Sequence, residues 1–370
     1  MRVKGKRGED QPEVGGGEDE YKMELVWRNI IGMIYLHYGA LIGLYLWFSG
    51  QVHWQTIIFG FVFAYSSAFG VTAGTHRLWA HKAYKANLPL RIMLAAMQTA
   101  ACQNSIHEWC RDHRVHHKFS ETDGDPHNAK RGFFFAHMGW LLCKKHPHVR
   151  SKGKVVDMSD LEQDPVVMFQ KKFFVPLTTL TCFVIPTYIP IAYFGETFYT
   201  AWNITLLRYI LTLHATWLVN SAAHIWGFRP YDSSINPAEN KLVSIITPGE
   251  GWHNFHHIFP FDYKAAELGD YKHNFSTAFI DFFAWLGWAY ELKTVPERVI
   301  LARIARTGDG THPSVAKKSK LDKNSNITAT TSTGGHHSHD LSTSWGWDDV
   351  DTPESVKQVT IIYNAKKSTT

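Results

Sequence analysis

The sequence predicts an all-α membrane protein with four transmembrane helices in two hairpins, capped by a cytosolic helical domain. Of its 370 residues, 45% are hydrophobic and 14% are aromatic, yet the mean hydropathy is only −0.21. The apolar residues must therefore be concentrated in blocks, as membrane spans require. The second observation is a pattern, H-x-x-H-H, which occurs twice in the chain. Together the two observations predict a membrane stem whose cap carries a di-metal histidine site.

The two hairpins are visible as uncharged stretches. Residues 29–50 and 51–75 contain no Lys, Arg, Asp or Glu, and each stretch is long enough to cross a bilayer. A second pair follows later, where one helix contains three prolines that would kink it. The other helix contains Arg208, which is costly at mid-membrane unless it snorkels or pairs. We expect spans at about 30–50, 54–74, 173–194 and 198–222.

Basic residues predict the orientation. Residues 74–171 carry 15 Lys and Arg against 9 Asp and Glu, whereas neither hairpin turn contains a Lys or Arg. By the positive-inside rule both termini and the cap face the cytosol. The endoplasmic reticulum membrane is the expected location of this multi-pass protein. The cap is expected at 75–172 and 225–306.

The two ends of the chain read as disordered. Residues 1–24 are rich in Gly and charge, and residues 307–370 are rich in Ser, Thr, Lys and Asn. Such segments bury too little apolar surface to fold. We expect a disordered cytosolic N-terminus at 1–24, one integrated domain at 25–306 and a disordered cytosolic tail at 307–370.

The two H-x-x-H-H motifs predict metal binding. Positions i, i+3 and i+4 share one face of a helix, so each motif can direct three imidazoles to one place. Chance would give roughly 0.08 matches in a chain with 22 His. The motif residues are His113, His116, His117, His253, His256 and His257.

Three more histidines and an asparagine stand at the cytosolic ends of the predicted spans: His76, His81, Asn220 and His224. Nine convergent imidazoles are too many for one ion and fit two, with four or five nitrogen ligands each. The lack of nearby Cys ligands disfavours structural zinc. We favour two iron ions that activate dioxygen, in a ligand set without the Glu-x-x-His pairs of soluble di-iron proteins.

Several longer runs resemble the acyl-CoA Δ9 (stearoyl-CoA) desaturases of animals, in the style of the insect members. These runs are H-R-L-W-A-H, W-C-R-D-H-R-V-H-H-K-F-S-E-T, D-P-H-N, R-G-F-F-F, N-S-A-A-H and G-E-G-W-H-N-F-H-H. The resemblance implies an enzyme with two Fe2+ that uses dioxygen to insert a cis double bond, most readily Δ9, into a saturated C16–C18 fatty acyl-CoA. It implies electrons from cytochrome b5 and NADH-cytochrome b5 reductase, and a surround of membrane lipid.

The resemblance also implies roles for individual residues. One iron would be held by His76, His224, His253 and His257, with a water steadied by Asn220. The other would be held by His81, His113, His116, His117 and His256. The coenzyme A head would meet Asn29, Arg111, Asp112, Lys144 and Lys145. The bend of the acyl tunnel would be lined by Gln103, Trp109, Thr216 and Trp217, and its far end by Ala64 and Ala68.

Alternatives remain at this point. Relatives of this kind include enzymes of other regiospecificity such as Δ11, and a histidine-cluster fatty acyl hydroxylase would use the same ligands. A membrane metal transporter is the non-enzyme alternative, although it would be expected to place its ligands at mid-membrane. The net charge of +5 does not indicate nucleic acid as a partner, and it can help to dock an acidic cytochrome b5.

Overall fold

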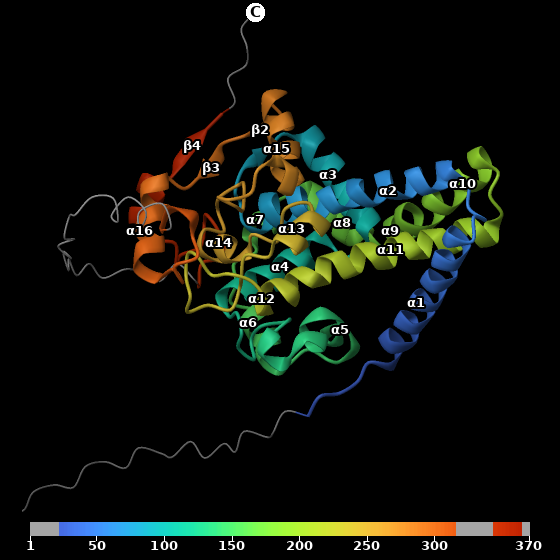
Figure 1. Ribbon diagram of the computed structural model, residues 1–370, viewed down its shortest axis with the longest axis horizontal. Helices are drawn as coiled ribbons and strands as arrows, with labels where there is room; N and C mark the ends of the chain where they lie inside the picture. The colour runs from blue at the N-terminus through green and yellow to red at the C-terminus, as the bar shows by residue number, and fades with distance from the viewer. Residues whose placement is uncertain (1–21, 316–342, 365–370) are drawn as a thin grey trace, which may run out of the picture.

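The computed structural model describes residues 22–315 and 343–364. Most of the predicted disordered N-terminus, and residues 316–342 and 365–370 of the predicted tail, lie outside the described residues. Figure 1 shows an elongated molecule. Long helices form a stem at one end, and shorter helices, loops and two small sheets form a cap at the other.

The first hairpin joins α1 (Trp27–Phe48) to α2 (Trp54–Phe69). The second helix does not stop where the sequence predicts. It continues as the π-helix η1 (Gly70–Ala80), so one continuous helix runs from Trp54 to Ala80. The extra turns matter because they carry the first histidine of the cap on the end of a membrane helix.

The second hairpin starts with three joined segments, α9 (Phe174–Thr178), the π-helix η4 (Thr179–Val184) and α10 (Ile185–Phe194). Pro186 has no N–H to donate to the carbonyl four residues earlier, that of Cys182. This carbonyl instead accepts a hydrogen bond of 2.8 Å from Arg208 Nη2. The proline thus provides the partner that lets a buried arginine lie among the stem helices.

The last stem helix, α11 (Phe198–Asn220), has 23 residues. It is nevertheless not among the helices that are long and apolar enough to cross a membrane. Within the described residues there are three of these, not the four expected: Trp27–Phe48, Trp54–Ala80 and Phe174–Phe194. The reason is where α11 lies. It packs against α1, α2 and α10, so much of its surface faces protein and tolerates Asn, Thr and Arg side chains.

The cap is built from short elements that follow each stem hairpin. After η1 come β1 (Lys85–Ala86), α3 (Leu88–Ala101), α4 (Ile106–Lys118), η2 (Ala129–Arg131), η3 (Phe135–Gly139), α5 (Trp140–Leu142), α6 (Pro147–Gly153), α7 (Ser159–Glu162) and α8 (Pro165–Lys172). After α11 come α12 (Ala222–Ile225), α13 (Lys241–Ile246), α14 (His253–Ile258), η5 (Tyr271–His273), α15 (Phe275–Trp285), β2 (Ala289–Tyr290), β3 (Leu292–Thr294) and α16 (Glu297–Thr307).

The prediction of a wholly disordered tail from residue 307 is wrong for residues 343–364. These form α18 (Glu354–Val359) and β4 (Ile361–Tyr363), and β4 pairs with β3 in an antiparallel sheet, as β1 does with β2. Trp345 is buried among cap residues. Polar composition misled the prediction because the segment is stabilised by contacts with the rest of the cap, not by a hydrophobic core of its own.

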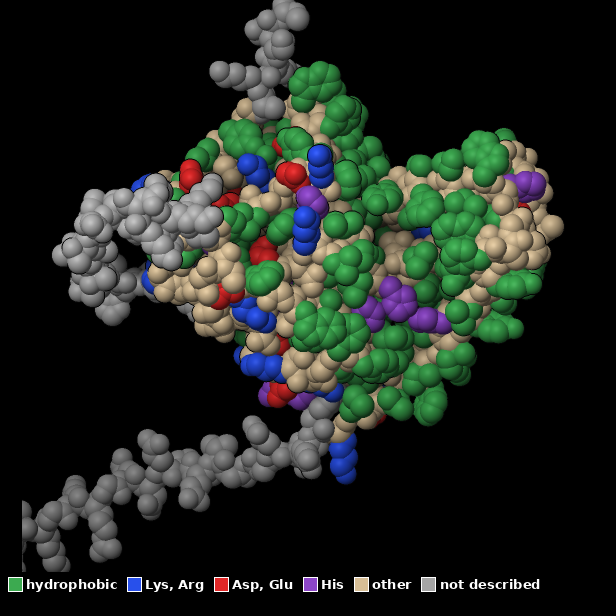
Figure 2. Space-filling model, viewed as in Figure 1, with side chains coloured by type: hydrophobic (Ala, Val, Ile, Leu, Met, Phe, Trp, Pro, Cys, Tyr) green, Lys and Arg blue, Asp and Glu red, His purple; other side chains and the backbone are tan. Residues whose placement is uncertain are grey.

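The outer surface differs between the stem and the cap. On the face shown in Figure 2, charged side chains gather over the cap, whereas the stem end is covered mainly by hydrophobic side chains. Residues such as Ile31, Tyr38 and Phe61 are more than half exposed on the stem helices. Exposed apolar surface of this extent indicates lipid contact.

Candidate metal centre

The end of the second stem helix aims two histidines at one point. In an α-helix, side chains five residues apart diverge by about 140°. In η1 the amide of His81 bonds the carbonyl of His76 at 3.1 Å, the i to i+5 bond of a π-helix. His76 and His81 therefore lie side by side, with ring centroids 4.7 Å apart.

The two H-x-x-H-H motifs lie on helices, as predicted. The first is on α4, whose N-cap residue Ser105 accepts a hydrogen bond from the amide of Glu108 through its hydroxyl oxygen. The second is on α14. All six motif imidazoles are buried except that of His113, which is partly exposed to a cavity.

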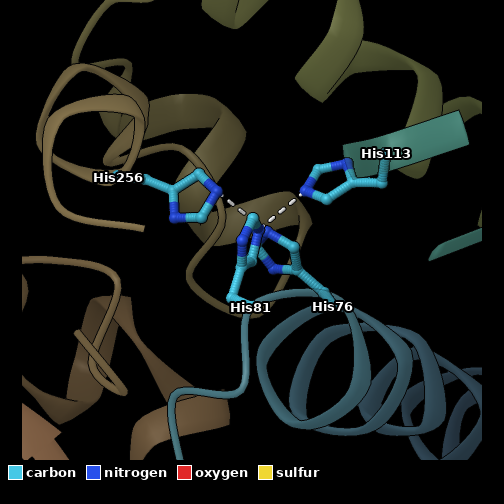
Figure 3. A group of neighbouring side chains, drawn as sticks. All are labelled: His76, His81, His113 and His256. Carbon is cyan, nitrogen blue, oxygen red and sulfur yellow. Dashed lines mark hydrogen bonds between the residues drawn. The ribbon is translucent and has the colours of Figure 1, made fainter. Parts of the chain in front are cut away.

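One group of imidazoles brings together four residues from three parts of the chain (Figure 3). The Nε2 atoms of His76 and His256 are 3.0 Å apart, and those of His81 and His113 are 2.8 Å apart. His117 joins this group, since its Nε2 lies 3.1 Å from that of His256. We call these five residues the first histidine group.

The second histidine group consists of His116, His224, His253 and His257. The Nε2 of His253 is 2.9 Å from that of His224 and 3.1 Å from that of His257. The ring of His117 stacks on that of His257, with centroids 4.2 Å apart. The two groups are therefore neighbours.

The expected partition of the histidines is wrong in two places. His76 lies in the first group and His116 in the second, the reverse of the assignment that the family resemblance implied. The physical reason is helical geometry. On α4, His113 and His117 are four residues apart and share a face, whereas His116 is rotated by about 100° from His117 and points to the other group.

Four of the nine rings are fixed through Nδ1, by groups that the sequence analysis missed. Glu250 accepts from His76 at 2.9 Å, Asp125 pairs with His116 at 2.8 Å and Glu121 pairs with His224 at 2.9 Å. The carbonyl of Trp345 accepts from Nδ1 of His81. The signal for the acids was in the sequence, since each stands within nine residues of a motif histidine.

These partners decide which nitrogen faces inward. A carbonyl oxygen can only accept, so Nδ1 of His81 carries the hydrogen, and Nε2 of the neutral ring carries a lone pair. The carboxylates impose the same tautomer on His76 and His224. The Nε2 lone pairs of His76, His81 and His224 each face Nε2 of a second imidazole at 2.8 to 3.0 Å. A cation bound between the rings would accept lone pairs from both nitrogens.

The electrostatics favour neutral rings. Burial lowers the pKa of most of these imidazoles well below the ordinary value of 6.5, and neighbouring imidazoles add to the shift, for His81, His113, His117, His253, His256 and His257. Burial also disfavours charge on His116, but Asp125 outweighs it and raises the pKa. Neutral imidazole is the form that binds metal.

The spacing also fits metal ions. Nitrogens bound at about 2.1 Å and at right angles to each other would lie about 3.0 Å apart, and the Nε2 pairs above are 2.8 to 3.1 Å apart. Nε2 of His116 is buried without a hydrogen-bond partner, as expected of a ligand atom. Both groups are therefore suited to hold a metal ion.

Comparison with known proteins agrees with this chemistry. The profile described as fatty acid desaturase matches residues 52–289. The chain belongs to the fatty acid desaturase family. It is 59% identical over 302 residues to an acyl-CoA Delta-9 desaturase of Acheta domesticus, covering 81% of this chain and 84% of the relative. It is 52% identical over 350 residues to an acyl-CoA Delta12-desaturase of the same species, covering 94% and 89%. It is 51% identical over 336 residues to an acyl-CoA Delta(11) desaturase of Spodoptera littoralis, covering 91% and 90%.

A cavity of about 340 Å³ in this desaturase leads to the first histidine group. It is lined by six of the nine predicted substrate residues and by His113: Asn29, Gln103, Trp109, Asp112, Thr216 and Trp217. Gln103 donates to Thr216 at 2.9 Å, and Trp109 stacks on His113. Asn220 lines the same cavity.

The residues predicted to bind the coenzyme A head group do not all line this cavity of the desaturase. Arg111 bonds Asp112 at 3.0 Å, and Lys145 pairs with the same carboxylate, so both stand beside the cavity mouth without lining it. Lys144 instead pairs with Glu24 on the surface at 2.5 Å. Arg28 lines the cavity and was missed by the sequence analysis. A single basic residue among uncharged neighbours gave no sequence signal.

Two further cavities extend the path into the stem of the desaturase. A small one, of about 70 Å³, shares Trp109, His113 and Asn220 with the first and touches His76 and His253. It shares Ala68 with a third cavity, of about 270 Å³, which Ala64 also lines. The cavities thus follow one another from the cap, past both histidine groups, into the apolar stem.

Proposed function

We propose that this protein is an acyl-CoA desaturase that inserts a cis double bond, at Δ9, into saturated C16–C18 fatty acyl-CoA. One observation carries the proposal: the chain of cavities is polar at the cap, passes both histidine groups and ends among apolar side chains. This sequence of surfaces matches a molecule with a charged head, a reactive centre and an apolar tail. The Δ9 position is supported by the 59% identity to the Delta-9 relative, against 52% and 51% for the Delta12 and Delta(11) relatives.

The protein's own residues would bind and orient the substrate. Arg28 and Asn29 at the mouth suit the phosphates and amide groups of coenzyme A, and Arg111 and Lys145 add positive charge next to them. Trp109 and Trp217 give the acyl chain two flat apolar walls. Their rigid rings hold one segment of the chain near His113, which favours attack at one bond.

The two histidine groups would hold two iron ions, which supply the activation of dioxygen that removes two hydrogens from an unactivated chain. The first ion would be held by His76, His81, His113, His117 and His256, and the second by His116, His224, His253 and His257. Asn220 lines the cavities between His113 and His253, where its amide would steady a water. Burial of the imidazoles keeps bulk water away.

The proposal includes the membrane arrangement. We propose that α11 is the fourth span, shielded from lipid by the other stem helices. Leu25 bridges to Cys143 and β4 pairs with β3, so both described ends of the chain lie on the cap. This supports two cytosolic termini in the endoplasmic reticulum membrane, with cytochrome b5 and its NADH-dependent reductase as electron donors to the cap.

Expression in a desaturase-deficient yeast tests the proposed function. Growth without added unsaturated fatty acid, and Δ9 products located by mass spectrometry, are the expected results. A product with a hydroxyl group would identify a hydroxylase instead. Double bonds only at Δ11 or Δ12 would keep the reaction type and overturn the Δ9 position.

The tunnel end has its own test. Ala64→Tyr adds a large side chain to the apolar stem cavity that Ala64 lines, so it should exclude the last methylenes of a C18 chain and shift products toward C16, because overfilled apolar space rejects extra carbon atoms. Ile58→Tyr, on the exposed side of the same helix, is the matched control. An unchanged C16 to C18 ratio in Ala64→Tyr would place the end of the acyl chain elsewhere.

A further inference from the structure

We propose that residues 343–364, here called the C-terminal strap, form a positioning element for His81 and so control metal binding by the first histidine group alone. The inference rests on the proposed function only in that the histidine groups hold metal. It adds a role for a segment whose composition predicted disorder. It also makes the two metal sites separable by changes to residues that are not themselves ligands.

The strap contacts His81 from two sides. The carbonyl of Trp345 accepts from Nδ1 of His81, and the amide of Trp347 donates to the His81 carbonyl at 3.0 Å. Between them, Gly346 lies so close that a Cβ there would meet the His81 carbonyl oxygen at 2.5 Å. Both the ring and the backbone of this one ligand are thus fixed by the strap.

The strap is itself held by the helix that carries the first motif. Lys118, the residue after His117, pairs with Asp349 at 2.8 Å and with Asp351 at 2.7 Å. Asp349 also accepts from the amide of Trp345 at 2.8 Å. The guanidinium of Arg114 lies 3.9 Å from the centre of a Trp345 ring. These contacts orient the Trp345 carbonyl toward His81.

The far end of the strap is anchored independently. β4 pairs with β3 over three residues, and the hydroxyl groups of Tyr363 and Tyr263 are 2.5 Å apart. These two anchors, the ion pairs at Asp349 and Asp351 and the pairing of β4, reduce the entropy that the strap loses when the Trp345 carbonyl meets His81. The contact can therefore persist although the segment has little core of its own.

The strap acts on one group only. Among the described residues, its hydrogen bonds and ion pairs reach His81 but none of His116, His224, His253 and His257. A partner that fixes the tautomer of a metal-bound histidine typically accounts for about 10- to 100-fold in metal affinity. Loss of the strap contact should therefore weaken the first site and spare the second.

The test measures metal per chain in the purified full-length protein. Gly346→Val pushes the strap away from the His81 backbone, and Lys118→Met removes its two ion pairs without shortening the side chain much. We expect each variant to bind the first metal about 10- to 100-fold more weakly, so that after dialysis one of two bound iron ions is lost. Lys85→Met, which breaks a surface pair with Glu291, and Val350→Ala, whose side chain is 90% exposed on the strap, are controls that should keep both.

Three outcomes overturn the proposal: two metals retained in both variants, both metals lost together, or a further loss when Gly346→Val is added to His81→Ala. The last comparison matters because a strap that acts through His81 has no effect once that ring is removed. Hydrogen exchange at the Trp347 amide verifies that the strap has moved in a variant that remains folded. A wild-type chain that binds no metal would instead defeat the proposed function and not the strap.

Discussion

The two histidine groups are built from similar imidazoles but are oriented by different partners. In the first group, one ring is fixed by a carboxylate, Glu250, and one by the neutral carbonyl of Trp345. In the second, two rings are fixed by the carboxylates Asp125 and Glu121. A carboxylate makes the imidazole it binds a stronger donor. The second group is therefore the more electron-rich, and the first depends on a distant part of the chain.

Replacing a ligand should have the largest effect and shows whether the groups are separate sites. His256→Ala should abolish desaturation and remove the metal of the first group, and His253→Ala should do the same for the second. Metal per chain, measured alongside product formation, checks both. His214→Ala is the control, since His214 contacts His37 and His137 outside both groups. Equal metal loss in the control, or full activity in His256→Ala, would contradict the assignment.

Changing the orienting carboxylates should have the next largest effect. Glu121→Gln should weaken metal binding by the second group about 10- to 100-fold, because the imidazole loses an anionic partner. Glu250→Gln should weaken the first group similarly. It should also lower the melting temperature, since Glu250 pairs with Arg77 at 2.8 Å in the protein interior and breaking such a pair costs about 3–5 kcal/mol. Titration with iron and thermal unfolding separate the two effects, and the same melting temperature for both variants would contradict this difference.

Asn220 should matter less than any ligand. Its amide lines the cavities beside His113 and His253 but belongs to neither group. Asn220→Ala should keep both metals and lower the rate by about tenfold, at the low end of the range for groups outside the ligand set. Loss of a metal ion in this variant would indicate that Asn220 is a direct ligand, and Asn220 would then have to be added to the second histidine group.

The smallest effect concerns a buried carboxyl without an imidazole partner. Burial raises the pKa of Glu239 to about 8 even though the amide of Phe255 donates to it, whereas His116 and other partners overcome burial and lower the pKa of Asp125 to about 2. The folded protein thus keeps a proton on Glu239 that the unfolded chain releases above 4.5. This contribution to stability is full below that value and is lost as the pH rises through about 8.

Glu239→Gln should therefore flatten the fall in melting temperature between pH 4.5 and about pH 8, the range in which the folded and unfolded states differ in the proton on Glu239. Asp270→Asn, a change to an exposed carboxyl, is the control and should leave the slope as it is. If the wild-type slope survives in Glu239→Gln, Glu239 is ionised in the folded state and a partner for it must be sought.

The sequence alone was enough for the parts of the fold that depend on local pattern. Uncharged stretches gave the positions of the stem helices to within a few residues, although the second helix extends to Ala80. Spacing placed both motifs on helices, and the nine histidines do converge. These features follow from the side-chain period of one helix and from the length of chain needed to cross a bilayer.

Only the tertiary structure decided which histidine joins which group, what fixes each ring and where the tail goes. The positions of His76 and His116 depend on a π-helical end and on the rotation of α4 relative to α12 and α14. His81 meets a carbonyl 264 residues away in the chain. A hydrogen bond to a backbone carbonyl leaves no trace in residue identity, because every residue has that group. Contacts of this kind depend on how distant segments pack, so no local sequence pattern can predict them.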